Sequence, residues 1–186
     1  MASIITATTS SGLTQQADNS GVLQLASGTG NLVTVPSVTG TAMVSGNMPA
    51  FSAYQTSGTS VSNGTFTKIA LQAEEFDTAN CFDSTTNYRF TPNVAGYYQI
   101  NGCVNISTAS QGLLASIYKN GSEYKRGVWF GNASSIGNQS IVSSIVYFNG
   151  STDYVELYIY QNQGGTYNTN SGSNITYFNG CMIRGA

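Results

Sequence analysis

Charged side chains are scarce in this chain, and histidine is absent. Asp, Glu, Lys and Arg make up 8% of the 186 residues, against about 25% in ordinary soluble domains. Without histidine the chain lacks the commonest general base and the commonest metal ligand. Six Lys and Arg residues and a net charge of −2 argue against nucleic-acid binding, which needs clustered cations. We therefore expect a non-enzymatic protein without a cofactor.

Long apolar runs and cysteine pairs are also missing. No apolar run approaches the ~20 residues that span a bilayer. The N-terminal residues lack a basic region and a sustained apolar region, so we expect no signal peptide and assembly in a cytoplasm. The three cysteines, Cys81, Cys103 and Cys181, are odd in number and form no CxxC pair, which argues against zinc. We expect Cys103 and Cys181 to be reduced core residues.

Residues 1–47 differ from the rest of the chain. They hold one charged residue, Asp18, and no aromatic residue, but three short apolar runs at 21–25, 31–35 and 41–44. None could bury enough surface alone, because isolated hairpins are marginal in water. The segment could be disordered, wrap around sister chains or lie along a larger partner, and its Val and Leu content favours an ordered arm that depends on partners. The candidate attachment residues are Val22, Leu23, Leu25, Leu32, Val33 and Val35.

Residues 48–186 have the pattern of an all-β domain. Short alternating runs are separated by turn residues, and no helical periodicity of useful length occurs. Asn120-Gly121 predicts a tight hairpin, because both residues tolerate the positive φ of a primed turn. Eight or nine strands in this length predict a two-sheet antiparallel jelly-roll sandwich. The expected strands are 51–55, 65–70, 88–90, 96–106, 113–119, 123–130, 139–148, 154–161 and 176–183.

Four segments of this domain carry a family resemblance. Phe90-Thr-Pro-Asn-Val-Ala-Gly leads into a strand in which Tyr98, Ile100, Gly102 and Val104 share one face. Pro49-Ala-Phe-Ser-Ala precedes it, and Asp153-Tyr-Val-Glu-Leu and Phe178-Asn-Gly-Cys-Met-Ile follow. In this order they resemble the C1q/TNF-like trimeric jelly rolls over essentially residues 48–186. The resemblance implies a homotrimer.

A second resemblance concerns lineage. Asp18-Asn-Ser-Gly-Val-Leu-Gln-Leu, followed by Met48-Pro-Ala-Phe-Ser-Ala, is similar to decoration, head-fibre and tail-fibre proteins of tailed bacteriophages. It implies a virion protein with a capsid or other virion protein as partner. The short arm favours a capsid cement or short head-fibre protein attached through residues 1–47. The alternative is a receptor- or glycan-binding tip of a tail fibre, whose partner would be a host surface glycan or receptor.

The tyrosines of the run 153–160 alternate with aliphatic residues. Val155, Leu157 and Ile159 fall on one face, which must be core. Tyr154, Tyr158 and Tyr160 fall on the other, and tyrosine is enriched where protein surfaces meet. We expect these three tyrosines at the trimer interface, because the strand lies near the threefold axis in the family it resembles. A solvated face or a sugar-stacking surface is the alternative.

Four of the eight acidic residues, Glu74, Glu75, Asp77 and Asp83, lie within ten positions. Oxygen-rich loops can hold Ca²⁺, but this spacing fits no EF-hand loop. Acid pairs can also serve a glycosidase, yet nothing else in the chain supports one. We interpret the segment as a solvated acidic loop and leave open whether it binds a cation.

Overall fold

The chain divides into two compact units, residues 1–40 and 41–186, whereas the sequence places the boundary after residue 47. The computed structural model describes residues 23–26, 32–35, 43, 45–106, 112–129 and 138–186. Each unit is considered separately below. Within the described residues, no helix is long and apolar enough to cross a membrane.

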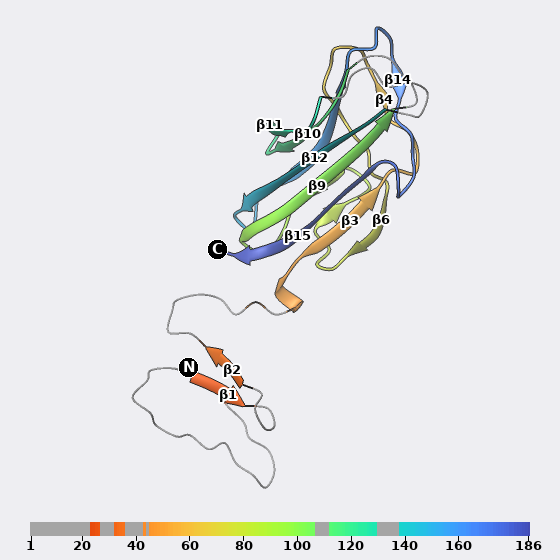
Figure 1. The fold of residues 1–186 in the computed structure, drawn as a ribbon. Helices are drawn as coiled ribbons and strands as arrows, with labels where there is room; N and C mark the ends of the chain where they lie inside the picture. Colours follow the sequence, from red (N-terminus) through yellow and green to blue (C-terminus); the bar gives the residue numbers. More distant parts are fainter. Residues whose placement is uncertain (1–22, 27–31, 36–42, 44, 107–111, 130–137) are drawn as a thin grey trace. The chain divides into compact units, whose positions relative to one another are not determined.

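The first unit contains a two-stranded antiparallel sheet (Figure 1). Strand β1 (Leu23–Ala26) pairs with β2 (Leu32–Val35), so two of the three apolar runs form strands that pair within the chain. The register sets Leu23 opposite Val35 and Leu25 opposite Val33. Because alternate residues of a strand share a face, these four residues lie on one face of the hairpin. Val22 and most of the third run lie outside the described residues.

The second unit begins with a 3₁₀ turn, η1 (Ser45–Asn47), and is a sandwich of two antiparallel sheets. The first sheet has the strand order β12-β9-β15-β3-β6. Its two longest strands, the edge strand β12 and its neighbour β9, pair over their whole lengths, from Gly96 opposite Phe148 to Ile106 opposite Asn138. The strands are β3 (Ala50–Tyr54), β6 (Ala73–Asp77), β9 (Gly96–Ile106), β12 (Asn138–Phe148) and β15 (Tyr177–Gly185).

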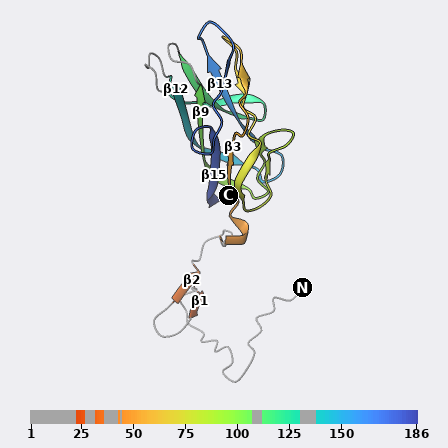
Figure 2. The same ribbon diagram turned by 90° about the vertical axis from the view of Figure 1, so that its right-hand side faces the viewer.

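The second sheet has the order β11-β10-β13-β8-β7, and β5 also pairs with β13. In the turned view of Figure 2, β12 and β9 of the first sheet lie apart from β13 of the second sheet. A small sheet of β4 (Ser60–Val61) and β14 (Tyr167–Asn168) completes the unit. The strands of the second sheet are β5 (Thr67–Lys68), β7 (Phe82–Asp83), β8 (Arg89–Phe90), β10 (Leu113–Lys119), β11 (Ser122–Arg126) and β13 (Val155–Gln161).

An aromatic cluster fills the space between the two sheets. The ring of Phe51 stacks on Phe90 at a centroid distance of 4.2 Å and on Phe82 at 5.2 Å. Tyr98 and Phe178 pack into the same core, and all except Phe82 are fully buried. The hydroxyl of Tyr98 donates a 2.8 Å hydrogen bond to the Val94 carbonyl, which satisfies its one buried polar group. The strand faces predicted to be core, with Tyr98, Ile100 and Val104 on one strand and Val155, Leu157 and Ile159 on another, are also fully buried and therefore confirmed.

The strand predictions hold where alternation is long. Strands 96–106 and 113–119 form as predicted, and Asn120 and Gly121 have φ of 52° and 79° at the hairpin. The prediction that the acidic segment is a loop is wrong, because residues 73–77 form β6, an edge strand paired with β3. Cys181 is also wrong as a core residue. Its neighbours on β15, Gly180 and Met182, are the ones that face inward, and Cys181 is exposed.

Candidate functional site

The outer surface of the first sheet exposes large apolar side chains. We call it the apolar face, and it consists of Tyr97, Ile141, Ile145, Tyr147 and Ile183. These residues are 41–53% exposed, and they come from three neighbouring strands, β9, β12 and β15. Tyr97 lies directly opposite Tyr147, with ring centroids 5.4 Å apart. Exposed aliphatic and aromatic residues gathered on one sheet face are typical of a protein contact surface.

A hydrogen-bonded group of amides and one hydroxyl lies in the middle of the apolar face. The Gln99 amide donates to Ser143 Oγ at 2.9 Å and to Asn101 Oδ1 at 3.1 Å. Ser143 Oγ donates to Asn101 Oδ1 at 2.8 Å, and the Asn101 amide donates to Asn179 Oδ1 at 3.1 Å. These polar groups therefore already have partners within the protomer, which lowers the cost of covering them.

The strands beneath this face are almost free of charge. β3, β9 and β12 contain no charged residue, and β15 contains only Arg184, near its end. Depletion of charge at the centre, with Tyr enriched, is the composition of an interface core. The face can thus bury itself against another neutral surface without stranding an unpaired charge.

The three predicted interface tyrosines lie on the other sheet. Tyr158 and Tyr160 belong to β13 and Tyr154 precedes it, and all three are partly buried on the outer side of that sheet. The ring of Tyr158 stacks on Tyr118 of β10 at 3.8 Å, and burial raises the pKa of Tyr158. The structure does not bring these tyrosines together with the apolar face. Their place in a trimer interface stays an untested prediction, and the apolar face is a separate candidate for that interface.

Two ion pairs lie among the tyrosines. Lys68 contacts Glu156 at 3.1 Å, and the guanidinium of Arg126 binds both carboxylate oxygens of Glu123 at 2.7 Å. The bond from Arg126 holds the pKa of the Glu123 carboxyl below its usual value. Sequence reasoning missed this arrangement, because alternation shows which residues share a strand face but not which strands become neighbours.

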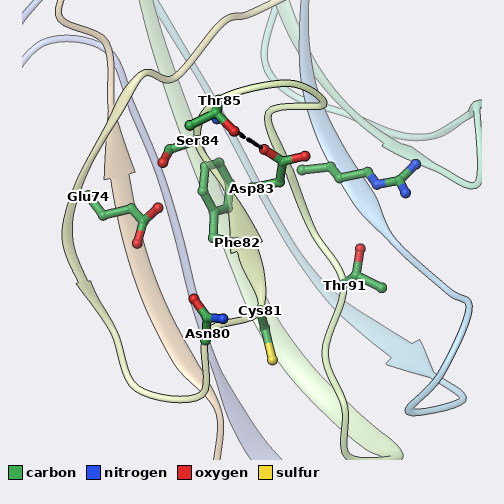
Figure 3. Close-up of a pocket in the computed structure, with 9 residues that line it drawn as sticks. Glu74, Asn80, Cys81, Phe82, Asp83, Ser84, Thr85 and Thr91 are labelled. Carbon is green, nitrogen blue, oxygen red and sulfur yellow. Dashed lines mark hydrogen bonds between the residues drawn. The ribbon is translucent and has the colours of Figure 1, made fainter.

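A hollow of about 570 Å³ opens beside β7 (Figure 3). The carboxylate of Asp83 is occupied within its own loop, because it accepts hydrogen bonds from the backbone N–H groups of Thr85, Thr86 and Asn87 at 2.9–3.0 Å. These bonds, from Thr86 first, hold the pKa of Asp83 well below its usual value. In Figure 3 the carboxylates of Glu74 and Asp83 lie on either side of the Phe82 ring.

Two further acids of this segment are also engaged in local structure. Asp77 accepts a 2.6 Å bond from the Phe82 N–H, and Glu75 accepts one of 2.8 Å from Ser52 Oγ. Among the described residues, no group of three or more His, Cys, Asp or Glu side chains is placed to hold a metal ion. Burial raises the pKa of the Cys81 thiol in the same hollow, which leaves it protonated at neutral pH.

No known protein-family profile matches the chain, and no curated protein matches it in sequence. Solved structures do match its fold. The TNF-family protein Eiger from S. frugiperda has a TM-score of 0.57 at 7% identity, over 75% of this chain and 93% of its own. The globular domain of zebrafish complement 1qA has 0.56 at 15%, over 74% and 98%. The PRD1 vertex protein P5 has 0.54 at 16%, over 73% and 97%. The chain therefore has the antiparallel jelly-roll fold of TNF- and C1q-like domains, as its four motifs predicted.

Proposed function

We propose that this protein is a non-enzymatic structural component of a virion, a homotrimer that decorates the capsid or forms a short head fibre. The observation that carries the proposal is the apolar face. It leaves five large apolar side chains about half exposed on a protomer whose strands there carry almost no charge. Burying such a face is favourable by about 25 cal/mol per Å² of apolar surface.

Closed rotational symmetry explains how one face can serve three copies. A ring closes when each copy contacts the next through two different patches of its own surface. The first sheet offers two such patches: the aliphatic residues of β12 on the apolar face, and a separate hollow lined by Phe76, Cys181 and Glu75, whose carboxylate already accepts a bond from Ser52. The edge strands β12 and β6 bound the sheet on its two sides, so neighbouring copies would also cover unpaired strand edges.

Attachment to the particle would be the work of the first unit. The hairpin β1–β2 is a two-stranded sheet with Leu23, Leu25, Val33 and Val35 on one face, and two strands alone are marginally stable in water. A partner that covers this face or extends a strand edge would stabilise it. We propose that the capsid is this partner, and that assembly takes place in the host cytoplasm. The likeness of fold to a protein named as a vertex protein supports a place on a virus particle.

A truncated chain beginning at Met48 tests this division of roles. The truncated chain keeps every buried residue of the described core and loses only Met43 among the residues packed against it, so it should fold and form trimers by sedimentation equilibrium. Mixed with virus particles that lack this protein, the full chain should bind to saturation, and the truncated chain should remain in the supernatant. If the truncated chain decorates the particles as fully as the intact one, attachment lies in the jelly roll and the role of the arm is wrong.

The matched control uses the register of the hairpin. Leu25→Ser replaces a residue on the Leu- and Val-bearing side of the hairpin. Gln24→Ser makes the same kind of change one position away, on the opposite side. We expect loss of particle binding with Leu25→Ser and full binding with Gln24→Ser. Equal binding of the two variants would mean that the apolar side of the hairpin is not the contact.

A further inference from the structure

The outer surface of the second sheet carries a continuous row of aromatic rings. We call it the aromatic surface, and it consists of Phe66, Tyr118, Trp129, Tyr158 and Tyr160. Neighbouring ring centroids are 5.9 Å apart for Trp129 and Tyr160, 5.2 Å for Tyr160 and Phe66, 5.8 Å for Phe66 and Tyr118, and 3.8 Å for Tyr118 and Tyr158. Each ring packs against the next, stacked for Tyr118 and Tyr158 and tilted for the other pairs, so the rings form one continuous aromatic row.

Trp129 is the end of this row, and its position is set by a glycine. The indole lies against Gly112 so closely that a Cβ at this position would overlap the ring. Yet Trp129 remains 49% exposed, and it is the only tryptophan of the chain. The half of the ring that faces water is available for a contact outside the protomer. This is the arrangement of a stacking platform.

The polar groups around the rings are neutral in sum. The guanidinium of Arg126 lies 5.7 Å from the centre of the Phe66 ring and is neutralised by Glu123. Lys68 and Glu156 neutralise each other across β5 and β13. The complementary ligand is therefore one without net charge. An ionic ligand would have to break a pair whose geometry is already good.

Free hydrogen-bonding groups border the rings. Within the described part of the chain, the hydroxyls of Tyr118, Tyr158 and Tyr160 have no hydrogen-bond partner. Each hydroxyl can donate one bond and accept others. Rings that offer an apolar face, with hydroxyl groups at their edges, match a sugar ring. A pyranose presents C–H groups on its faces and hydroxyls around its rim.

We propose that the aromatic surface binds a neutral oligosaccharide, with sugar rings stacked on Trp129, Tyr160 and Phe66. A protein partner is the less favoured occupant, because the exposed isoleucines gather on the apolar face of the other sheet. The inference rests on the proposed trimer in one respect: contacts through the apolar face leave the aromatic surface free. A surface of this kind would let the assembled particle hold a glycan-coated host cell.

Trp129 reports directly on binding, because excitation at the long-wavelength edge of the absorption band selects this one indole over the twelve tyrosines of the chain. We would titrate the full-length protein with neutral hexasaccharides of glucose, N-acetylglucosamine, mannose and galactose, and with a hyaluronan hexasaccharide as the acidic probe. We expect a saturable emission change with at least one neutral probe, at about millimolar concentration or below. Silence with all neutral probes, or binding of the acidic probe only, overturns the proposal.

Variants then locate the site. Tyr160→Ala should weaken binding of the responding probe by about two- to tenfold, the factor expected for one lost ring contact. Tyr97→Ala, on the apolar face, should leave it unchanged. Trp129→Ala removes a half-exposed ring and spares the core. Its binding of the probe, measured by calorimetry because the variant has no indole, should also be weaker. If Tyr160→Ala and Trp129→Ala both bind the probe like the intact protein, the sugar binds elsewhere and the proposal is wrong.

The oligomeric state separates this proposal from the proposed function. Each variant is examined by sedimentation equilibrium beside the binding measurement. If Tyr160→Ala yields monomers and no neutral probe binds the intact protein, the aromatic surface is a contact between copies of the chain and the sugar proposal fails. If Tyr160→Ala stays trimeric and loses only sugar binding, both the trimer through the apolar face and the sugar site stand.

Discussion

The substitution Ile145→Lys is the sharpest test of the apolar face. Ile145 is 53% exposed in the protomer, so roughly half of the 1.5–3 kcal/mol for burying such a side chain remains to be gained on assembly. This is about 0.8–1.5 kcal/mol for each contact, or roughly 2–5 kcal/mol for the three contacts of a trimer. A lysine forfeits this gain and adds a desolvation penalty of several kcal/mol for each buried charge.

The expected result is a folded monomer. Sedimentation equilibrium at micromolar concentration should show a trimer for the intact protein and a monomer for Ile145→Lys. The far-ultraviolet circular dichroism should be unchanged, because the new side chain projects from the surface of the protomer. Ile145→Ala should give an intermediate, concentration-dependent equilibrium. A weak effect of the lysine would show that the contact is rim and not core.

The control is Tyr124→Lys. Tyr124 is 42% exposed and lies on β11, at the edge of the other sheet, so the same charge is added at a comparable exposure outside the apolar face. It should remain trimeric. The reasoning is refuted if Ile145→Lys is as trimeric as the intact protein, or if both substitutions dissociate it to the same extent.

Three further predictions concern other parts of the fold. Tyr158→Lys removes a stacked ring and should lower the unfolding free energy by about 0.5–1.5 kcal/mol in urea titrations while the protein stays trimeric; monomers would instead support the tyrosines as the interface. The depressed pKa of Asp83 means that this carboxylate stabilises the fold above about pH 3.9, its unfolded pKa, and that this stabilisation is lost as pH falls through the lower folded pKa. Asp83→Asn should therefore lower the Tm at neutral pH and flatten its dependence below about pH 4; an unaltered Asp83→Asn profile contradicts the role of these hydrogen bonds. Gly102→Ala brings a Cβ within 2.5 Å of Leu157 Cδ1 and 3.3 Å of Phe178, so it should cost about 1–3 kcal/mol in chemical denaturation, and full stability would show that the core between the sheets has room to spare.

Much of the fold could be predicted because its strongest signals are local. The alternation over 96–106 and the Asn120-Gly121 turn depend on backbone geometry within a few residues, and both form as expected. The strand β6 could not be predicted, because Glu74 and Glu75 disfavour a strand locally. Pairing with β3 overrides that preference and leaves both acids at an exposed sheet edge.

The candidate surfaces divide in the same way. Alternation along a strand determined that Tyr158 and Tyr160 share one face and that Leu157 lies on the other, since side chains of a strand point alternately to its two sides. The alternating runs also determined that the second unit is an all-β domain, and the composition determined that it carries little charge. None of this depends on the rest of the chain.

Only the tertiary structure decided which strands share a sheet. It set β13 against β10 and β5, so that Tyr158 stacks on Tyr118 and Trp129 reaches Tyr160. It also placed Ile145 beside Gln99 on the opposite sheet, where the apolar face forms. The physical reason is that pairing joins residues far apart in the chain, such as Ile145 with Gln99 and Tyr158 with Lys68. The balance of burial over the core selects one pairing among many that the local pattern allows.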